Sequence, residues 1–161
     1  MKLPKPRKII AEKYVAGLSL FKSRRSPIKL SANESALGPS PKAVKSYSSI
    51  GKGFVRYPDS DGTFFRKVLA KKFRLKRDRI ILGSGSDQIF ELVCKLFLNK
   101  GDEVIVPEYS FIIYRIYSRM FGAKVKFGKE ENFKPSLQSI LNCINSRTKI
   151  VFLANPNNPT G

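Results

Sequence analysis

The pattern of apolar and polar positions changes along the chain near residue 63. Residues 30–61 are rich in Asn, Gly and Pro, which predicts an extended arm with one short helix near 41–50. From Thr63 to Phe73, Phe64, Val68 and Leu69 recur with basic residues between them. That spacing predicts an amphipathic helix.

Beyond residue 78, short apolar runs alternate with amphipathic segments. The runs predict strands at 79–82, 103–106, 123–127 and 150–154, and the segments between them predict helices at 87–98, 111–121 and 135–142. Strands joined through helices form a mostly parallel sheet that is flanked by helices. The predicted fold class is therefore α/β.

Composition bounds the kind of protein and its partners. The 161 residues are 42% hydrophobic and 27% charged, as in one folded domain or a large part of one. An excess of 31 Lys+Arg over 12 Asp+Glu gives a net charge of +19, which attracts anions. Because the basic residues are scattered, we expect a solvated surface, with a basic, non-catalytic module that binds nucleic acid as the alternative.

Cysteine and histidine usage excludes other chemistries. Cys94 and Cys143 cannot build a disulfide framework, and the absence of histidine excludes a Cys/His metal site. We predict no metal and a reducing, cytoplasmic setting. The apolar run 14–21 lacks a convincing signal-peptide cleavage site, and no run approaches the ~20 apolar residues of a membrane span.

Two motifs lie at expected strand ends. Ile81-Leu-Gly-Ser-Gly-Ser-Asp87 leads from a strand into a helix, where glycines and unpaired helix amides can cradle a phosphate. The alternative is an ordinary turn in which Ser84 or Ser86 caps the helix. Asn155-Pro-Asn-Asn-Pro-Thr-Gly161 can hold an Asn side chain out of the last strand, or can simply be a tight turn.

These motifs and three others, in order, resemble the class I and II aminotransferases, which use pyridoxal 5'-phosphate. Leu30-Ser-Ala-Asn-Glu-Ser-Ala-Leu-Gly-Pro-Ser-Pro41 is similar to the signature of the histidinol-phosphate group, although Ser35 and Ala36 replace the usual Asn-Pro. Arg56-Tyr-Pro58 and Pro107-Glu-Tyr-Ser-Phe-Ile-Ile-Tyr114 follow. The resemblance implies an extended arm with part of a small domain at 1–62, and an incomplete cofactor-binding large domain at 63–161.

The resemblance also implies cofactor contacts. Backbone amides of Gly85, Ser86 and Asp87 would hold the cofactor phosphate, and Phe111 would stack on its pyridine ring. Asn158 would hydrogen-bond the phenolic oxygen. The alternative for Phe111 is core packing.

Further residues would act on the substrate or across a dimer. Tyr57 would reach the cofactor phosphate of a neighbouring subunit in a homodimer, or would simply pack at the end of the arm. Asn33 and Glu34 belong to the region that closes over the substrate. The resemblance therefore implies a site shared between two chains.

The implied reaction exchanges an amino group between histidinol phosphate and 2-oxoglutarate, in histidine biosynthesis. The implied partners are thus a small-molecule amino donor and a 2-oxo acid. Threonine-phosphate decarboxylase and aromatic amino-acid aminotransferase are the alternatives within the family. Its Schiff-base lysine would follow Gly161, so the sequence offers no catalytic residue and we expect the chain alone to be inactive.

Overall fold

The computed structural model describes residues 12–15 and 28–161, and the chain divides into two compact units. One unit contains Met1–Tyr14 and Gly83–Gly161, and the other contains Val15–Leu82. The domain division at residue 62 stays a prediction. Of the apolar run 14–21, residues 16–21 lie outside the described residues. Among those that are described, no helix is both long and apolar enough to cross a membrane.

The unit Val15–Leu82 is helical in its described part. It contains α1 (Pro41–Ser49), the 3-10 helix η1 (Gly51–Val55), α2 (Thr63–Phe73) and the 3-10 helix η2 (Arg77–Arg79). Both helices predicted before residue 74 are therefore confirmed. Proline in the first turn favours α1, and the Asp59 carboxylate accepts the Thr63 N–H at 2.6 Å where α2 begins.

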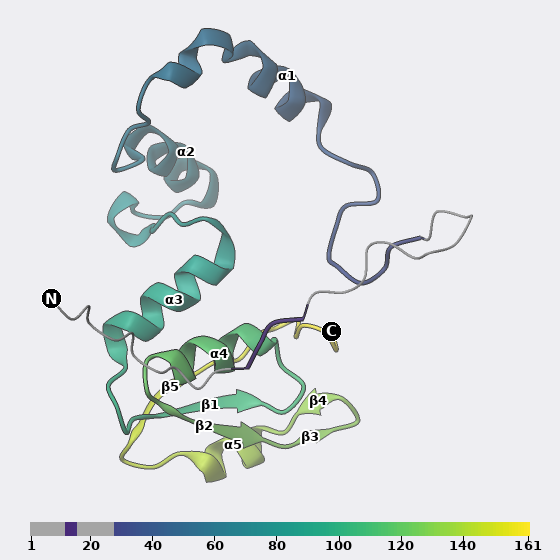
Figure 1. Ribbon diagram of the computed structural model, residues 1–161, viewed down its shortest axis with the longest axis vertical. Helices are drawn as coiled ribbons and strands as arrows, with labels where there is room; N and C mark the ends of the chain where they lie inside the picture. The colour runs from purple at the N-terminus through teal and green to yellow at the C-terminus, as the bar shows by residue number, and fades with distance from the viewer. Residues whose placement is uncertain (1–11, 16–27) are drawn as a thin grey trace, which may run out of the picture. The chain divides into compact units, whose positions relative to one another are not determined.

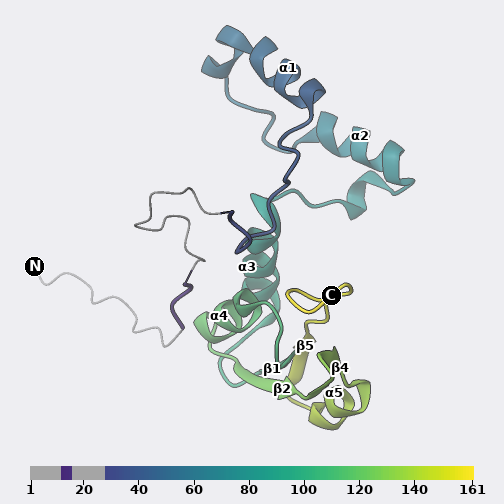
Figure 2. The same cartoon turned by 90° about the vertical axis from the view of Figure 1, so that its right-hand side faces the viewer.

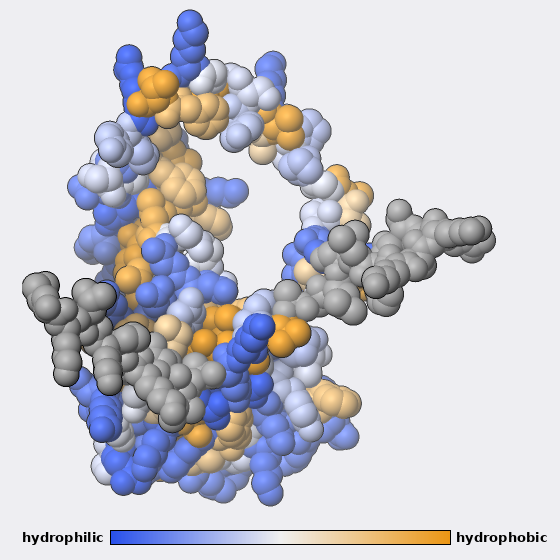
Figure 3. Space-filling model, in the orientation of Figure 1, coloured by the Kyte–Doolittle hydropathy of each residue, from blue (hydrophilic) through white to orange (hydrophobic). Residues whose placement is uncertain are grey.

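None of these four helices has a buried residue. Hydrophobic side chains are visible on the surface over α1 and α2 (Figure 3). The strand predicted at 79–82 is wrong. Ile80 has extended dihedral angles, but residues 80–82 join no β-ladder in the part of the chain that is described. A strand exists only through pairing, which an apolar run cannot supply by itself.

The second part of the chain is an α/β unit, which confirms the predicted fold class (Figure 1). Its elements are α3 (Gly85–Phe97), β1 (Glu103–Pro107), α4 (Ile112–Met120), β2 (Lys124–Gly128), β3 (Glu130–Glu131), β4 (Lys134–Pro135), α5 (Leu137–Cys143) and β5 (Thr148–Val151). The main sheet has the order β2-β1-β5, and both pairings are parallel. Val104 of β1 lies between Val125 and Ile150.

Strand β1 is the centre of this unit, and all of its residues are buried. Its connection through α4 leads to β2, and the connection through α5 returns past β1 to β5. Because parallel crossovers are right-handed, connections that run in opposite directions place their helices on opposite faces of the sheet. Accordingly, α4 and α5 cover opposite faces (Figure 2).

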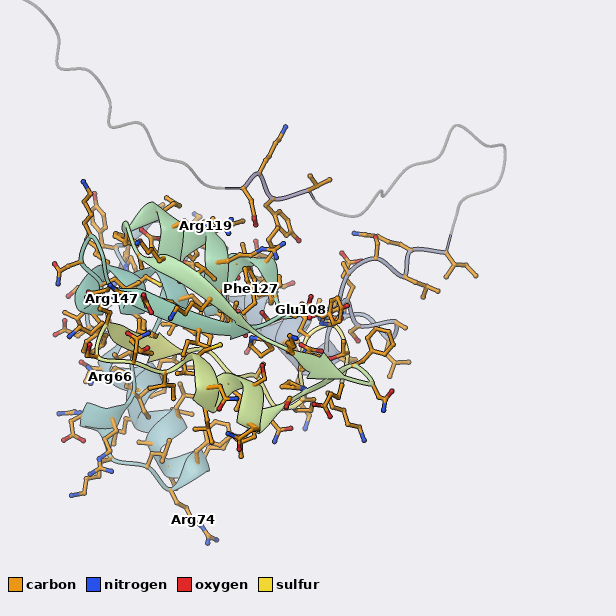
Figure 4. The ribbon with its side chains drawn as sticks, turned by 90° about the horizontal axis from the view of Figure 1, so that it is seen from below. Arg66, Arg74, Glu108, Arg119, Phe127 and Arg147 are labelled. Atoms are coloured by element: carbon orange, nitrogen blue, oxygen red, sulfur yellow. The ribbon has the colours of Figure 1, made fainter. Side chains whose placement is uncertain are left out.

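A buried carboxylate ties the amino-terminal end of the sheet together. The Glu103 side chain is 2% exposed and accepts hydrogen bonds from Lys126 of β2 at 2.8 Å and from Asn145 at 2.7 Å. Arg147 donates to its other oxygen at 2.9 Å. Arg147 lies at this end of β1, and Glu108 lies at the opposite, carboxyl end (Figure 4).

Several segments differ in detail from the sequence prediction, and α4, β2 and α5 differ from it by one or two residues at their ends. Helix α3 begins two residues before the predicted start, and β5 begins at Thr148 and ends at Val151 instead of spanning 150–154. The antiparallel hairpin β3–β4 was not predicted. Its turn residues are Asn132 and Phe133, and Phe133 is not a residue type that signals a hairpin turn.

Candidate functional site

The turn before α3 has the backbone geometry of an anion cradle. Gly85 has a φ of 77°, a left-handed conformation that glycine adopts readily. The Gly85 N–H donates to the Gly83 carbonyl at 2.9 Å, and the Ser84 N–H donates to Oε1 of Gln88 at 2.6 Å. Ser84 occupies the N-cap position without a side-chain capping bond. Gln88 therefore caps the helix, and the serine cap expected from an ordinary turn does not form at Ser84.

The next two amides are the donors that the cradle offers. The backbone N–H groups of Ser86 and Asp87 lie in the first turn of α3, where a helix has no internal acceptor for them. Among the hydrogen bonds of the described residues, none satisfies either amide. Both lie at the positive end of the helix dipole, so this turn can bind a phosphate.

Three aromatic rings connect the cradle helix to the sheet. Phe90, in the second turn of α3, meets the Tyr114 ring of α4 edge-on, with 4.8 Å between the ring centroids. It also meets Phe152, just after β5, edge-on at 5.9 Å. Tyr114 and Phe152 stack at 4.8 Å. These contacts hold the start of α3 beside the carboxyl end of β5, the edge where open α/β sheets bind ligands.

Phe111 lies just before α4, where its ring is partly buried against the core. It meets Tyr114 edge-on at 6.0 Å, so the structure shows the core packing that was its alternative role. Sequence reasoning missed Tyr109, which lies two residues after β1 and is 49% exposed. An aromatic residue two positions after a buried strand was the available signal. Tyr109 is the more accessible ring at this edge.

The segment Asn155–Gly161 forms a tight turn after β5. Asn157 is 7% exposed, and its Nδ2 donates to Oγ1 of Thr160 at 2.7 Å. The Gly161 N–H donates to the Asn157 carbonyl at 2.8 Å. Asn158 is half-buried in this turn. The turn therefore fixes the backbone on both sides of Asn158, at the same edge of the sheet as Phe152.

The remaining predicted residues belong to the unit Val15–Leu82. Tyr57 is fully exposed, and its neighbours in the chain are exposed as well. Asn33 is also exposed, and Glu34 forms an ion pair with Lys29 at 2.8 Å. Their roles toward a cofactor or a substrate stay predictions.

Other site chemistries have little support. The described residues contain no group of three side chains that could hold a metal ion. Both cysteines are free thiols, and burial raises the pKa of Cys94, which opposes a role as a nucleophile. The candidate site residues of this unit therefore lie at the carboxyl edge of the sheet.

Comparisons with known proteins agree with this arrangement. Residues 25–161 match the family model described as aminotransferase class I and II. A histidinol-phosphate aminotransferase of Pelagibacter ubique is 49% identical over 161 residues, which are 100% of this chain and 45% of that protein. Histidinol-phosphate aminotransferase 1 of Caulobacter vibrioides is 37% identical over 99% of this chain and 44% of its own length. The chain thus spans less than half of these relatives.

A solved structure shows the same fold. The histidinol-phosphate aminotransferase of Sinorhizobium meliloti, in complex with pyridoxal-5'-phosphate, superimposes with a TM-score of 0.76 at 22% identity. The match covers 80% of this chain and 35% of that one. At this identity the likeness describes the fold.

Proposed function

Since the chain belongs to the class I and II aminotransferase family, we propose that it holds pyridoxal 5'-phosphate for transamination between histidinol phosphate and 2-oxoglutarate. The cofactor, when bound, supplies an electron sink for the reacting carbon. The residues of this chain bind and orient it. The substrates are those of the histidinol-phosphate aminotransferases, the group to which the Pelagibacter ubique and Caulobacter vibrioides relatives belong.

The observation that carries the proposal is the pair of unsatisfied amides at the start of α3. Ser86 and Asp87 have N–H groups that can donate to an anion, and the left-handed Gly85 directly precedes them at the start of the helix. The Asp87 carboxylate is in the same turn, so the phosphate must be bound by the backbone and not by that side chain. Phe90 fixes the helix start to the sheet edge.

Two rings are candidates for stacking on the cofactor. Phe111 is one, and its edge-on contact with Tyr114 connects it to Phe90 of α3, which also meets Tyr114. Tyr109 is the other, and about half of its surface is accessible. Asn158 supplies an amide that can donate to the phenolic oxygen. We therefore propose Phe111 as the stacking ring, because its contacts lead to the cradle helix, whereas Tyr109 contacts the ring of Phe133 in the β3–β4 hairpin.

Binding to the chain tests the cradle. Replacing Gly85 with Ala strains a left-handed backbone, and we expect the affinity for pyridoxal 5'-phosphate to fall by roughly tenfold or more. Gly101→Ala is the matched control, because Gly101 also has positive φ, and at both glycines an added Cβ meets no atom within 4 Å. Equal affinities of the two variants, or equal binding of pyridoxal without phosphate, would refute the cradle.

Activity tests the substrate assignment. The test protein joins this chain to the part of the Pelagibacter ubique relative that the chain does not cover. This joined protein is supplied with histidinol phosphate, an aromatic amino acid or threonine phosphate. We expect transamination to be fastest with histidinol phosphate. Preference for the aromatic amino acid, or release of carbon dioxide from threonine phosphate, would favour the corresponding alternative within the family.

The proposal includes a cytoplasmic homodimer. Free thiols at Cys94 and Cys143 suit a reducing compartment. The full exposure of Tyr57 suits a side chain that reaches a neighbouring subunit. If it does, Tyr57→Phe weakens cofactor binding in the joined protein without changing its sedimentation as a dimer.

A further inference from the structure

We propose that α2 and the segment that follows it through η2 form a binding surface for single-stranded nucleic acid, independent of the cofactor. Eight of the fourteen residues at 66–79 are Lys or Arg and one is acidic, whereas the whole chain has 31 Lys and Arg in 161 residues. The basic residues, although present in every segment, are therefore densest here. Seven of the eight are exposed, and we call them the basic patch: Lys67, Lys71, Lys72, Arg74, Lys76, Arg77 and Arg79.

Arg66, the eighth basic residue, holds the two basic segments together. Its Nη2 donates to the Arg77 carbonyl at 2.9 Å, which joins α2 to η2. The Leu75 N–H donates to the Ala70 carbonyl at 3.0 Å and holds the turn between the two helices. The basic patch therefore belongs to a folded surface whose shape is maintained by hydrogen bonds.

The protein does not neutralise the charges of the basic patch. Among the described residues, none of the seven side chains forms a salt bridge, although Asp78 lies between two of them in the sequence. The dipole at the end of α2 favours Lys71 and Lys72, but it does not account for the basic residues beyond the helix. Crowded positive charges attract a polyanion, which releases its counterions when it binds.

Arg74 keeps a positive charge at the corner between α2 and η2. It is the C-cap residue of α2 and has a φ of 53°, a left-handed conformation for which glycine is preferred. Its side chain extends away from the ribbon (Figure 4). An arginine that stands where glycine is favoured indicates a use for its guanidinium group.

Exposed aromatic rings lie beside the lysines of α2. The Phe64 ring is 76% exposed, and helical spacing places Lys67 and Lys71 on the same face as this ring. At the other end of the helix, Nζ of Lys72 lies 5.6 Å from the centroid of the Phe73 ring, which is 58% exposed. Proteins bind single strands through basic groups that follow the phosphates and through rings that stack on the bases. The rings therefore favour a single strand over a partner that offers only negative charge.

The first test measures binding of the full chain to a fluorescein-labelled oligouridylate of about 16 nucleotides, a length comparable to known single-strand sites. Fluorescence anisotropy between about 50 and 200 mM KCl should give a slope of roughly −3 to −5 for log K against log salt, with about −0.7 for each basic group engaged. An oligodeoxythymidylate of the same length is the DNA arm. Binding of either strand with this slope supports the proposal, and no salt-dependent binding of either strand would overturn it.

The second test removes charge from the basic patch. Lys71→Gln together with Lys72→Gln should reduce the steepness of the salt dependence by about 1.4 and weaken binding at low salt roughly tenfold. Lys42→Gln together with Lys45→Gln is the matched control, because these exposed lysines of α1 carry the same charge in the same unit. Equal effects of the two double variants would show that net charge alone attracts the strand, and would overturn the proposal.

The third test removes a ring. Phe64→Leu keeps an apolar side chain, and it should weaken binding about fivefold or more while leaving the salt dependence unchanged. Phe97→Leu in α3 is the control, since that ring is 57% exposed and belongs to the other unit. Equal affinities of the two variants would contradict the recognition of bases by the rings of α2.

Competitors distinguish this surface from other sites and partners. An excess of pyridoxal 5'-phosphate should leave the oligouridylate bound, because the cradle belongs to the other unit, and displacement would place the strand in the cradle instead. Phosphatidylserine vesicles should compete more weakly than unlabelled oligouridylate at equal phosphate concentration. Stronger competition by vesicles would identify an anionic membrane as the partner, and self-association that excludes the oligouridylate would identify a second copy. Either result would overturn the proposal, whereas loss of cofactor binding alone would refute only the proposed function.

Discussion

Tyr114 of α4 and Phe152 after β5 lie ring on ring, with 4.8 Å between centroids and 5° between ring planes. They come from segments that are adjacent only in the folded chain. Phe90 of α3 closes the group by meeting both rings edge-on. The position of the cradle relative to the sheet therefore depends on this aromatic cluster.

Phe152→Ala should destabilise the chain by about 3 to 5 kcal/mol, because it removes a 9% exposed ring and leaves a cavity. Urea unfolding followed by circular dichroism measures the loss. Phe97→Ala is the control, since that ring of α3 is 57% exposed, and we expect a change below about 1 kcal/mol. Similar losses in both variants would show that the cluster is not the core of this unit.

Glu103 should give the chain an acid-sensitive stability. Hydrogen bonds lower the pKa of Glu103 from 4.5 to about 2, and the bond from Lys126 contributes more than the bond from Asn145. A carboxyl group whose pKa is lower in the folded state stabilises fully above pH 4.5, and this contribution disappears as the pH falls toward 2.

The urea midpoint, measured between pH 6 and pH 2 (roughly the range that the linkage covers), should fall less steeply in Glu103→Gln than in the unchanged chain. Glu131→Gln serves as the control, because that carboxylate is exposed, and its curve should follow that of the unchanged chain. Parallel curves for all three proteins would contradict the link between Glu103 and acid stability.

Gln88 should separate helix stability from anion binding. Gln88→Ala removes the acceptor of the Ser84 N–H and should cost about 1 kcal/mol, the usual value of an N-terminal cap. Gln88→Glu keeps an acceptor and adds a negative charge that the helix dipole favours. That charge also repels phosphate, so we expect equal or higher thermal stability with weaker binding of inorganic phosphate. Stronger phosphate binding by Gln88→Glu would contradict the cradle.

Glu12 should contribute little, and only at low salt. It forms ion pairs with Arg115, at 2.6 Å, and with Arg119 of α4. These side chains are partly exposed, so Glu12→Gln should change the free energy of unfolding by less than about 1 kcal/mol. Repeating the measurement at about 1 M salt, where charges are screened, should remove the difference. A large effect that persists in salt would point to packing by the segment around Glu12.

The sequence predicted the elements with strong periodicity. It did not predict correctly the segments in which strand formation depends on pairing with another strand. The helix 63–73 and the strand around Val104 have clear patterns, and both are present. Residues 79–82 have a strand-like composition but no paired strand. The β3–β4 hairpin escaped prediction because Phe133, at a left-handed position, is not a turn residue by type.

The candidate site was predictable to a similar extent. Glycine and serine before an apolar helix indicated the cradle, and the structure adds the Gln88 cap that sequence reasoning could not assign. Phe111 and Tyr109 are both aromatic residues after β1. Only the folded chain distinguishes the ring that packs in the core from the ring that remains accessible.

The strand order also determines the time that passes between the synthesis of β1 and the synthesis of the two strands that pair with it. Strand β2 follows β1 closely, but β5 begins about 40 residues after β1 ends. At roughly 5 to 20 residues per second, one side of β1 stays open for several seconds while the ribosome completes the second crossover. The apolar run Val104-Ile-Val106 is exposed to other nascent chains during that interval, so the yield of folded protein should depend on the rate of translation between residues 107 and 151.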